Sequence, residues 1–398
     1  MKILVLSDAS INANTGGFSQ TLYNIFSFIE PENFLLITSS SAYKEALPSA
    51  PFTSRTVVYK FEIIKPKRNR IGIYINRYID AFNFNINYRF RSFKKIKKAI
   101  HQFNPDVIIT APNGQVGLFM HNALKPLFEN KKVYPYFMDD WLHKPRMKWI
   151  GGSIHALAKK ILNENKAWMM VSKNLADVFI ERYKVKPERI LEIHNPVKFS
   201  GNEQIIPLEK KQHYTFAYAG ALWQMHFDAF TAVAKAIKML QAERDISLIV
   251  YTQESQWEWR KKEMELLPVI YGGNIPYSDI HEKLSAADFL IITSSFHKEY
   301  YTHSKASVQT KLTDYLKAGR LIISCGPPYS VNHEFLKKYD CGICIETTDE
   351  NKIAANLNTI LENPFGYNQY ILNGIKVLKE EFTLETVQKR LQKFLEAL

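Results

Sequence analysis

A repeated alternation of short apolar runs and longer amphipathic stretches constrains the fold of this 398-residue chain more than any other feature. The runs are rich in Ile, Leu and Val, as in Ile3–Ser7 and Val107–Thr110, and the stretches between them have helical length, as in Ser19–Ile29. Apolar strands joined by helical crossovers are typical of a parallel sheet that helices cover on both faces. The alternation therefore predicts an α/β fold.

The alternation runs through the chain in two series. The strands expected in the first are Ile3–Ser7, Asn33–Thr38, Thr56–Phe61, Val107–Thr110, Val133–Met138, Trp168–Val171 and Ile190–Ile193. The strands expected in the second are Tyr214–Ala219, Ser247–Tyr251, Val269–Tyr271, Phe289–Thr293, Leu321–Ser324 and Gly342–Ile345. Helices are expected at Ser19–Ile29, Phe93–Phe103, Asp228–Leu240, Tyr277–Ala286, Lys311–Ala318 and Leu384–Leu398. A polar stretch, Phe199–His213, lies between the two series and is typical of a linker.

Two series of similar size predict two Rossmann-like, doubly wound domains that face a central cleft. We expect an N-terminal domain at residues 1–200, a linker at 201–213, a second domain at 214–375 and a final amphipathic helix within 376–398. In such domains, ligands bind outside the carboxyl ends of the strands. Functional residues are therefore expected in the loops that follow the strands.

The formal charge of +13 is concentrated in one segment. Between Lys60 and Lys98 there are twelve Lys and Arg against two acids, so the rest of the chain carries only +3. Such an excess is typical of a protein with an anionic partner, such as a membrane, a nucleic acid or a phosphorylated ligand. Aromatic residues are interleaved with the basic ones, which fits a membrane-surface helix, a nucleic-acid surface or an ordinary solvated helix with aromatic core contacts. The basic residues expected at this surface are Lys65, Lys67, Arg68, Arg70, Lys94, Lys95, Lys97 and Lys98.

Several classes of protein are excluded by composition. Three cysteines are too few for a disulfide framework, and an apolar fraction of 46% excludes intrinsic disorder. No run of about 20 apolar residues is present, so no membrane-spanning helix is expected. The first apolar run is too short for a signal peptide and is typical of a buried strand. A cytoplasmic protein is the expectation.

Three loops after expected strands carry glycine or acidic residues. Gly16 and Gly17 precede an amphipathic helix, and Gly220 ends a strand before another helix. Each glycine loop could be a phosphate-binding turn or a plain tight turn. Asp139 and Asp140 follow a third strand, where one could be a general base, both could bind a metal, or Asp140 could only cap a helix. We favour an active-site role without a metal, because no further carboxylate cluster accompanies the pair.

The segment Ser304–Arg320 is the most specific of the motifs. Its loop contains Lys305 and hydroxyls such as that of Ser307, and the helix that follows carries Lys311 and Asp314 on one face. A lysine in the first turn of a helix opposes the macrodipole unless an anion binds there. A diphosphate would be such an anion, and Asp314 could accept both hydroxyls of a ribose. The alternative is a surface ion pair between the Lys311 and Asp314 side chains.

Residues 311–324, KLTDYLKAGRLIIS, resemble the K-L-x-E-Y-L-A-A-G-x-P-V-I signature of GT-B glycosyltransferases similar to family 4. The glycine pair at 16–17, NPV at 195–197, YAG at 218–220, FMDDW at 137–141 and the final helix resemble further segments of these enzymes in order and spacing. The resemblance implies a nucleotide-sugar donor and retention of the anomeric configuration. It also implies that Asp314 binds the ribose, that the preceding loop binds the diphosphate, and that the final helix crosses back onto the N-terminal domain.

Two departures from the family pattern affect the expected donor site. The family often has two glutamates with seven residues between them, whereas this chain has Ala306 at the first position and Asp314 at the second. The Arg and Lys that often hold the β-phosphate are replaced by a loop that contains His226. Lys305 and Lys311 are the expected replacements, with His226 as a further candidate.

The sequence thus predicts a metal-independent hexosyl- or deoxyhexosyltransferase of cell-surface polysaccharide synthesis, with a glycan or lipid-linked acceptor. Asp139 or Asp140 would position or deprotonate the acceptor hydroxyl. Many such enzymes use lipid-linked acceptors, so the resemblance favours an anionic membrane over a nucleic acid as partner, and peripheral association with the inner face of the cytoplasmic membrane. A nucleotide-sugar epimerase on the same fold and a non-catalytic basic scaffold are the alternatives. The donor sugar, the acceptor and the oligomeric state stay open.

Overall fold

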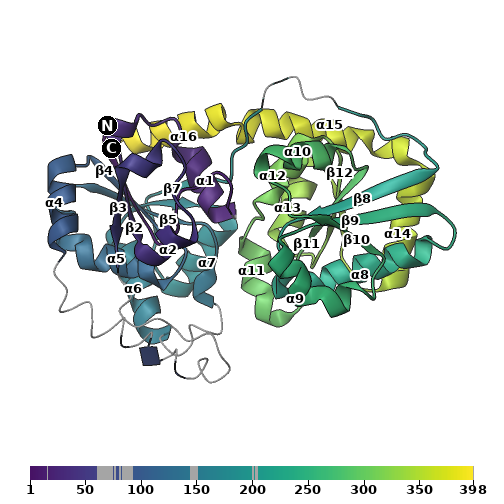
Figure 1. Ribbon diagram of the computed structural model, residues 1–398, viewed down its shortest axis with the longest axis horizontal. Helices are drawn as coiled ribbons and strands as arrows, with labels where there is room; N and C mark the ends of the chain where they lie inside the picture. The colour runs from purple at the N-terminus through teal and green to yellow at the C-terminus, as the bar shows by residue number, and fades with distance from the viewer. Residues whose placement is uncertain are drawn as a thin grey trace. The chain divides into compact units, whose positions relative to one another are not determined.

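The computed structural model describes residues 1–15, 17–60, 93–143, 151–199 and 205–397, together with Ile75, Tyr78, Ile79, Phe82 and Gly201. The chain forms two compact units (Figure 1). The first contains Met1–His194 and Gln388–Leu398, and the second is the continuous segment Asn195–Val387. Every helix of the described residues is too short or too polar to cross a bilayer.

The first unit is built on a parallel sheet of seven strands in the order β3-β2-β1-β4-β5-β6-β7. Its strands are β1 (Ile3–Ser7), β2 (Phe34–Ser39), β3 (Thr56–Tyr59), β4 (Val107–Ala111), β5 (Lys132–Phe137), β6 (Ala167–Met170) and β7 (Arg189–Glu192). Its helices are α1 (Gly17–Phe26), α2 (Ser40–Glu45), α4 (Lys94–Phe103), α5 (Gln115–Leu124), α6 (Gly151–Glu164) and α7 (Lys173–Tyr183). Strands β1 and β4 are buried along their whole length, as apolar strands of a covered parallel sheet must be.

The C-terminal helix α16 (Leu384–Glu396) supplies the last part of the first unit. Its buried residues Leu391, Phe394 and Leu395 lie on one face. The Phe394 ring lies 5.4 Å from the ring of Tyr134 on β5, and the Arg189 guanidinium lies 4.6 Å from the Phe394 ring centroid. The end of the chain is therefore part of the core of a unit that the N-terminal residues begin.

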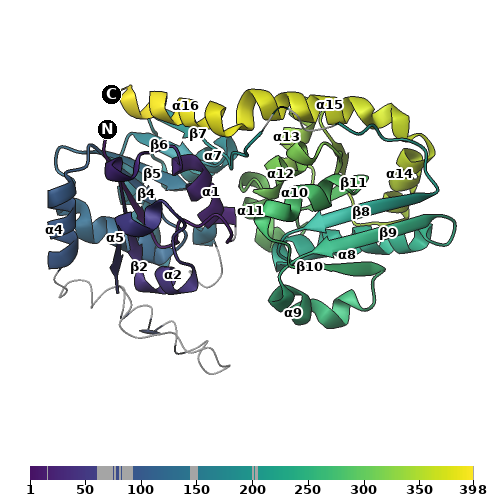
Figure 2. The same cartoon turned by 45° about the horizontal axis from the view of Figure 1, so that its top comes forward.

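The second unit has a parallel sheet of six strands in the order β10-β9-β8-β11-β12-β13. Its neighbouring strands β8, β9 and β10 are labelled in Figure 2. Its strands are β8 (His213–Ala219), β9 (Asp245–Tyr251), β10 (Val269–Gly273), β11 (Phe289–Thr293), β12 (Leu321–Cys325) and β13 (Ile343–Ile345). Its helices are α8 (Gln224–Leu240), α9 (Glu254–Met264), α10 (Tyr277–Ser285), α11 (Tyr301–Ala306), α12 (Lys311–Ala318), α13 (Val331–Tyr339), α14 (Glu350–Glu362) and α15 (Asn368–Val377). A π-helical segment, Leu378–Phe382, follows α15.

Alternate residues of β8 face opposite sides of the second sheet. Phe216 and Tyr218 pack with the apolar faces of α8 and α14, whereas Ala217 and Ala219 pack with those of α10 and α12. The sheet is thus covered on both faces, and the expected doubly wound α/β fold is confirmed. Because all strands of a sheet are parallel, their carboxyl ends meet at one edge, where the loops of interest begin.

The polar stretch expected to link the domains packs against the second unit. Leu208 is buried in the core of that unit, and its backbone N–H donates to Asn368 Oδ1 at 2.7 Å. Upstream of it, Val197 pairs with Thr383 as a parallel bridge. The division between units lies earlier in the chain, between His194 and Asn195. Helix α8 begins at Gln224, four residues before the expected start at Asp228.

Candidate active site

Helix α12 is held at the carboxyl edge of the second sheet by the buried side chain of Tyr315. The Tyr315 hydroxyl accepts a hydrogen bond from Ala219 N at 2.8 Å and donates one to Ile291 O at 3.1 Å. These contacts tie the helix to β8 and β11 at the same time. The first turn of α12 is therefore fixed next to the loop that follows β8.

Lys311 begins α12 and extends under that loop. Its Nζ lies 3.8 Å from the ring centroid of Tyr218, is buried, and has no hydrogen-bond partner in the described structure. Burial lowers the pKa of Lys311 to about 7, because the charged form is poorly solvated there. A buried amine without a partner is costly, and an anion near the helix N-terminus would be its natural partner.

Gly220 covers the Lys311 amine. Its φ is +132°, in the region that favours glycine, and its N–H donates to Tyr251 O at 2.9 Å. A Cβ at this position would lie 3.0 Å from Lys311 Nζ. Glycine therefore allows both the turn and the close approach of the lysine.

Asp314 lies one turn after Lys311, and the two side chains engage different groups. The Asp314 carboxylate accepts a hydrogen bond from the Tyr277 hydroxyl at 2.8 Å, and burial raises its pKa to about 6. Lys311 instead lies over Tyr218. The alternative interpretation of these residues as a surface ion pair is therefore wrong.

The loop before α12 contains two further buried polar atoms without partners, Ser307 Oγ and Gln309 Oε1. The Gln309 side-chain amide donates to Thr293 O at 2.6 Å. Together with Lys311, they make three unpartnered polar atoms within five residues of sequence. Ala306 is fully buried, and its methyl side chain has no polar group that could act as the family glutamate does.

Two further expected donor residues, His226 and Lys305, lie on α8 and α11. The His226 Nδ1 lies 3.0 Å from Thr293 O, the carbonyl that also accepts from Gln309, so this nitrogen must carry the proton. Burial lowers the pKa of His226 well below its usual value, which leaves the ring neutral at neutral pH. A neutral imidazole is a weak phosphate ligand. The Lys305 Nζ lies 5.7 Å from the Tyr301 ring centroid.

The two acids after β5 have different surroundings. Both carboxylate oxygens of Asp140 accept from the Arg182 guanidinium, Oδ1 at 2.7 Å from Nη1 and Oδ2 at 2.5 Å from Nη2. The Asp140 side chain is fully buried, so this bidentate pair fixes α7 to the loop after β5. Asp139 is only half-buried, and its Oδ1 accepts from Trp141 N at 3.2 Å. The geometry favours Asp139 over Asp140 as a group that meets a substrate.

A third carboxylate, Asp8, lies at the same edge and was missed in the sequence. It follows β1, and its Oδ1 accepts from Asn113 N at 2.6 Å. Burial raises its pKa to about 6, although hydrogen bonds from the backbone of Asn113, Gly114 and Gly117 oppose that rise. Two features of the sequence could have indicated this site. They are an acid directly after a buried strand and the segment PNGQVG at 112–117 after another strand.

The first unit also contains buried polar atoms without partners. Buried side chains with such an atom are Ser10, Gln20 and Gln115. They belong to the loop after β1, to α1 and to the start of α5. Gly17 is the first residue of α1, and Gly16 lies outside the described residues.

The expected basic surface is described only in part. Lys65, Lys67, Arg68 and Arg70 lie outside the described residues. Lys94, Lys95, Lys97 and Lys98 are all exposed on α4, whose Ile96 and Ile100 are buried in the core of the first unit. In the described part of the chain no group of three or more His, Cys, Asp and Glu is placed to hold a metal ion.

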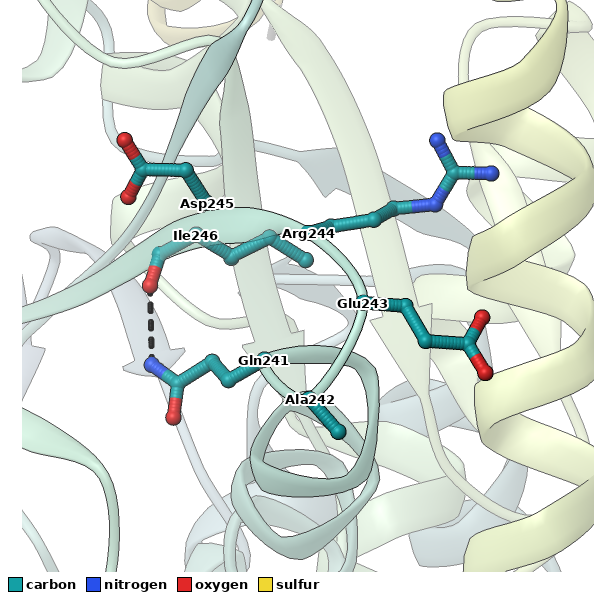
Figure 3. A pocket seen from close by; sticks show the side chains of 6 residues that line it. All are labelled: Gln241, Ala242, Glu243, Arg244, Asp245 and Ile246. Carbon is teal, nitrogen blue, oxygen red and sulfur yellow. Dashed lines mark hydrogen bonds between the residues drawn. The ribbon is translucent and has the colours of Figure 1, made fainter.

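A surface hollow lies between the end of α8 and the start of β9 (Figure 3). In it, the Gln241 side-chain amide donates to Ile246 O at 2.8 Å. Asp245 is the first residue of β9, so the hollow lies at the amino end of that strand. Gly220 and Lys311 lie at the opposite, carboxyl edge, where ligands of parallel sheets bind.

Two family models match successive parts of the chain. The model of glycosyltransferase family 4 matches residues 52–200, and the model of glycosyl transferases group 1 matches residues 213–363. No curated protein sequence matches the chain significantly.

The fold is shared with solved structures across the whole chain. The Anabaena protein Alr3699/HepE in complex with UDP is 13% identical, with a TM-score of 0.70 and full coverage of both chains. Its complex with UDP-glucose gives 14% identity, a TM-score of 0.68 and the same coverage. Sucrose-phosphate synthase of Thermosynechococcus elongatus is 12% identical, with a TM-score of 0.70 over 100% of this chain and 99% of that chain. Two family models in succession and this fold together mean that the chain belongs to the GT-B glycosyltransferases of the family 4 type.

Proposed function

We propose that this glycosyltransferase takes its sugar from a nucleotide-sugar donor whose diphosphate binds at Lys311. The observation that carries the proposal is the buried Lys311 amine, which has no partner and lies between Gly220 and the Tyr218 ring. A diphosphate would restore its charge and supply hydrogen-bond acceptors. The Anabaena protein has the same fold over the full length of both chains, and it binds UDP and UDP-glucose. This supports a nucleotide-sugar donor here.

The other residues of the second unit have roles that follow from this placement. Asp314, held by Tyr277, would accept the ribose hydroxyls. Ser307 and Gln309 would use their unpartnered oxygens on the donor, and Lys305 would add positive charge. As the sugar leaves, negative charge grows on the diphosphate, and Lys311 together with the α12 N-terminus would stabilise it.

The acceptor would bind at the carboxyl edge of the first sheet. Asp139 would orient or deprotonate the acceptor hydroxyl, whereas Asp140 would hold the loop through Arg182. We propose a retaining, metal-independent transfer of a hexosyl or deoxyhexosyl group. Unpartnered polar atoms of Ser10, Gln20 and Gln115 are suited to sugar hydroxyls, which supports a glycan as the acceptor.

The exposed lysines of α4 support a place at an anionic membrane. Four lysines, at positions 94, 95, 97 and 98, face solvent on a helix that buries only its isoleucine side. Such a face attracts acidic lipid headgroups. We therefore propose a lipid-linked glycan as the acceptor, in cell-surface polysaccharide synthesis at the inner face of the cytoplasmic membrane.

Thermal shifts with nucleoside diphosphates test the donor site directly. We expect UDP, GDP, dTDP or ADP to raise the melting temperature of the wild-type protein, because a ligand that binds only the native state stabilises it. Lys311→Met should weaken that binding about 30-fold, equivalent to losing a charged hydrogen bond of about 2 kcal/mol. Asp314→Asn should weaken binding of the nucleoside diphosphate but not of inorganic pyrophosphate, which has no ribose.

The matched control is Lys352→Met, which removes an exposed lysine of α14. It should bind the nucleotide as the wild type does. The donor-site proposal fails if no nucleoside diphosphate shifts the wild-type melting temperature, or if Lys311→Met binds as tightly as the control.

A further inference from the structure

The loop between β4 and α5 is folded around a carboxylate from another strand. Asp8 follows β1, and the backbone N–H groups of Asn113, Gly114 and Gly117 hydrogen-bond its side chain. These groups belong to the loop after β4 and to the first turn of α5, where N–H groups have no partner within the helix. Asp8 thus occupies the position that an anion takes at a helix N-terminus.

The two glycines of this loop are matched to the Asp8 carboxylate. A Cβ at Gly114 would lie 3.1 Å from Asp8 Oδ2. A Cβ at Gly117 would lie 2.8 Å from Asp8 Oδ1 and 2.7 Å from Pro112. A larger residue at either position would push the carboxylate away, so the PNGQVG loop and Asp8 form one fitted unit.

A second hydrogen bond joins the same loop to the acidic segment after β5. The indole N–H of Trp141, which is buried, donates to Pro112 O at 3.1 Å. The backbone N–H of Trp141 donates to Asp139 Oδ1 at 3.2 Å. A short path of contacts therefore leads from Asp8 through the 112–117 loop and Trp141 to Asp139.

We propose that Asp8 is a positioning residue, an internal carboxylate that holds the loops after β1, β4 and β5 together and so sets the position of Asp139. Asp8 does this as an acceptor of backbone hydrogen bonds and forms no bond with substrate. The structural part of the proposal stands on the contacts of the first unit alone. The effect on sugar transfer rests on the proposed function, because it requires Asp139 to meet the acceptor.

Hydrogen exchange tests the structural part without any substrate. In Asp8→Gly the amides of residues 113–117 and the segment 138–142 should exchange at least about tenfold faster than in the wild type, while the strands keep their protection. Sodium formate should restore protection, because it can occupy the space of the missing carboxylate, whereas sodium chloride at equal ionic strength should not. Asp8→Asn, which keeps the side-chain volume, covers the case that Asp8→Gly does not fold and should give a smaller increase.

The matched control is Asp106→Ala. Asp106 also joins β1 and β4, since its Oδ2 accepts from Lys2 N at 2.7 Å, but at the amino ends of these strands. It should leave exchange at residues 113–117 unchanged. The proposal is overturned if Asp8→Gly and Asp8→Asn exchange like the wild type in both segments, or if only residues 113–117 change and 138–142 do not.

Turnover with a nucleotide-sugar donor separates this inference from the proposed function. Once a donor that shifts the melting temperature is known, Asp8→Asn should lower kcat for release of the nucleoside diphosphate and leave nucleotide affinity unchanged. Formate should raise kcat of Asp8→Gly. Lost nucleotide affinity in Asp8→Asn, or kcat equal to that of the wild type, would contradict a positioning role, whereas failure of the wild type to bind any nucleotide would contradict the proposed function and leave the exchange result intact.

Discussion

At Lys311 the chain keeps a primary amine out of water without a hydrogen-bond partner, and this arrangement has a cost in the unliganded protein. The amine lies against the face of Tyr218, 3.8 Å from the ring centroid, and next to Gly220. Burial lowers the lysine pKa from its ordinary 10.5 to about 7, so the amine can titrate near neutral pH. Binding of an anion removes this cost, and it makes the affinity for the anion depend on pH.

Nucleotide affinity should therefore fall as the pH rises above 7. A bound diphosphate favours the charged lysine and raises its pKa, so binding above pH 7 takes up a proton and can weaken up to about tenfold per pH unit. The terminal phosphate, with a pKa of about 6, is ionised over this range. Calorimetry with UDP between pH 7 and 9 in buffers of different ionisation enthalpy measures both the slope and the proton uptake. Lys311→Met should flatten the slope, and an equal slope in that variant would show that another group titrates.

Asp139 and Asp140 have different surroundings, so their asparagine variants should differ in stability and in kcat. Asp140→Asn removes the charge that pairs with both Arg182 nitrogens and should cost about 3 kcal/mol of stability, because one partner of a buried pair is left alone. Asp139→Asn should change stability little and lower kcat for sugar transfer. Urea unfolding and kinetics of both variants test these assignments, with Asp177→Asn, at an exposed position of α7, as the control. A stable Asp140→Asn with impaired kcat would reverse the two assignments.

The sequence predicts a site residue best when the residues that it acts with are close to it in the chain. Lys311 and Asp314 share a short helix, so their common face follows from spacing alone. Asp8 is held by a loop more than a hundred residues away, and Tyr277, which hydrogen-bonds Asp314, lies on a different helix. His226 was a candidate phosphate ligand from its place in the loop. The sequence does not show that its ring is hydrogen-bonded to Thr293 O. Contacts of this kind depend on the folded arrangement of several loops.

At the level of elements, apolar periodicity predicted the strands well. The expected bounds of β1, β11 and α12 coincide with those in the structure, and most other strands differ by one or two residues at an end. Strands buried on both faces give a strong local signal, because nearly every side chain must be apolar. The start of α8 was placed too late because residues 220–227 were assigned to a phosphate loop, whereas the helix begins just after Trp223.

Helix α4 should bind anionic membranes through its exposed lysines. At about 1 kcal/mol per basic residue near an acidic surface, changing Lys94, Lys95, Lys97 and Lys98 to Gln should abolish most flotation with phosphatidylserine-containing liposomes. The buried Ile96 and Ile100 are untouched, so the fold should persist. The control changes four exposed lysines of the second unit, Lys261, Lys262, Lys338 and Lys352, to Gln, with the same loss of charge. Equal flotation of both variants, or none of the wild type, would reject the membrane surface.

At the scale of the whole molecule, the two units differ in how the chain builds them. The second unit is one continuous segment, Asn195–Val387, whereas the first needs residues from both ends of the chain. The resemblance to family 4 implied that the final helix crosses back onto the N-terminal domain, and residues 388–398 do belong to the first unit. The contacts of Phe394 with Tyr134 and Arg189 show which residues of the first unit its apolar face meets.

This difference predicts unequal behaviour of fragments. Residues 195–387 contain their own sheet and both covering layers, so this fragment should fold alone and keep nucleotide affinity and its dependence on Lys311. Residues 1–194 lack the buried Leu391, Phe394 and Leu395. At about 2 kcal/mol for each buried side chain, the loss approaches the whole stability of a typical domain, so the fragment should be largely unfolded.

Adding the C-terminal helix back tests whether the fragment 1–194 is unfolded because it lacks the apolar side chains of α16. Residues 384–397 joined to 1–194 by a Gly/Ser linker should restore a cooperative thermal transition seen by circular dichroism. The same fusion with Leu391→Asp and Phe394→Asp should not, because a charged side chain cannot enter the core without a large cost. A folded 1–194 fragment with the melting temperature of the fusion would mean that α16 covers the unit without stabilising it. The apolar face of α16 would then have to be explained by a role other than core packing.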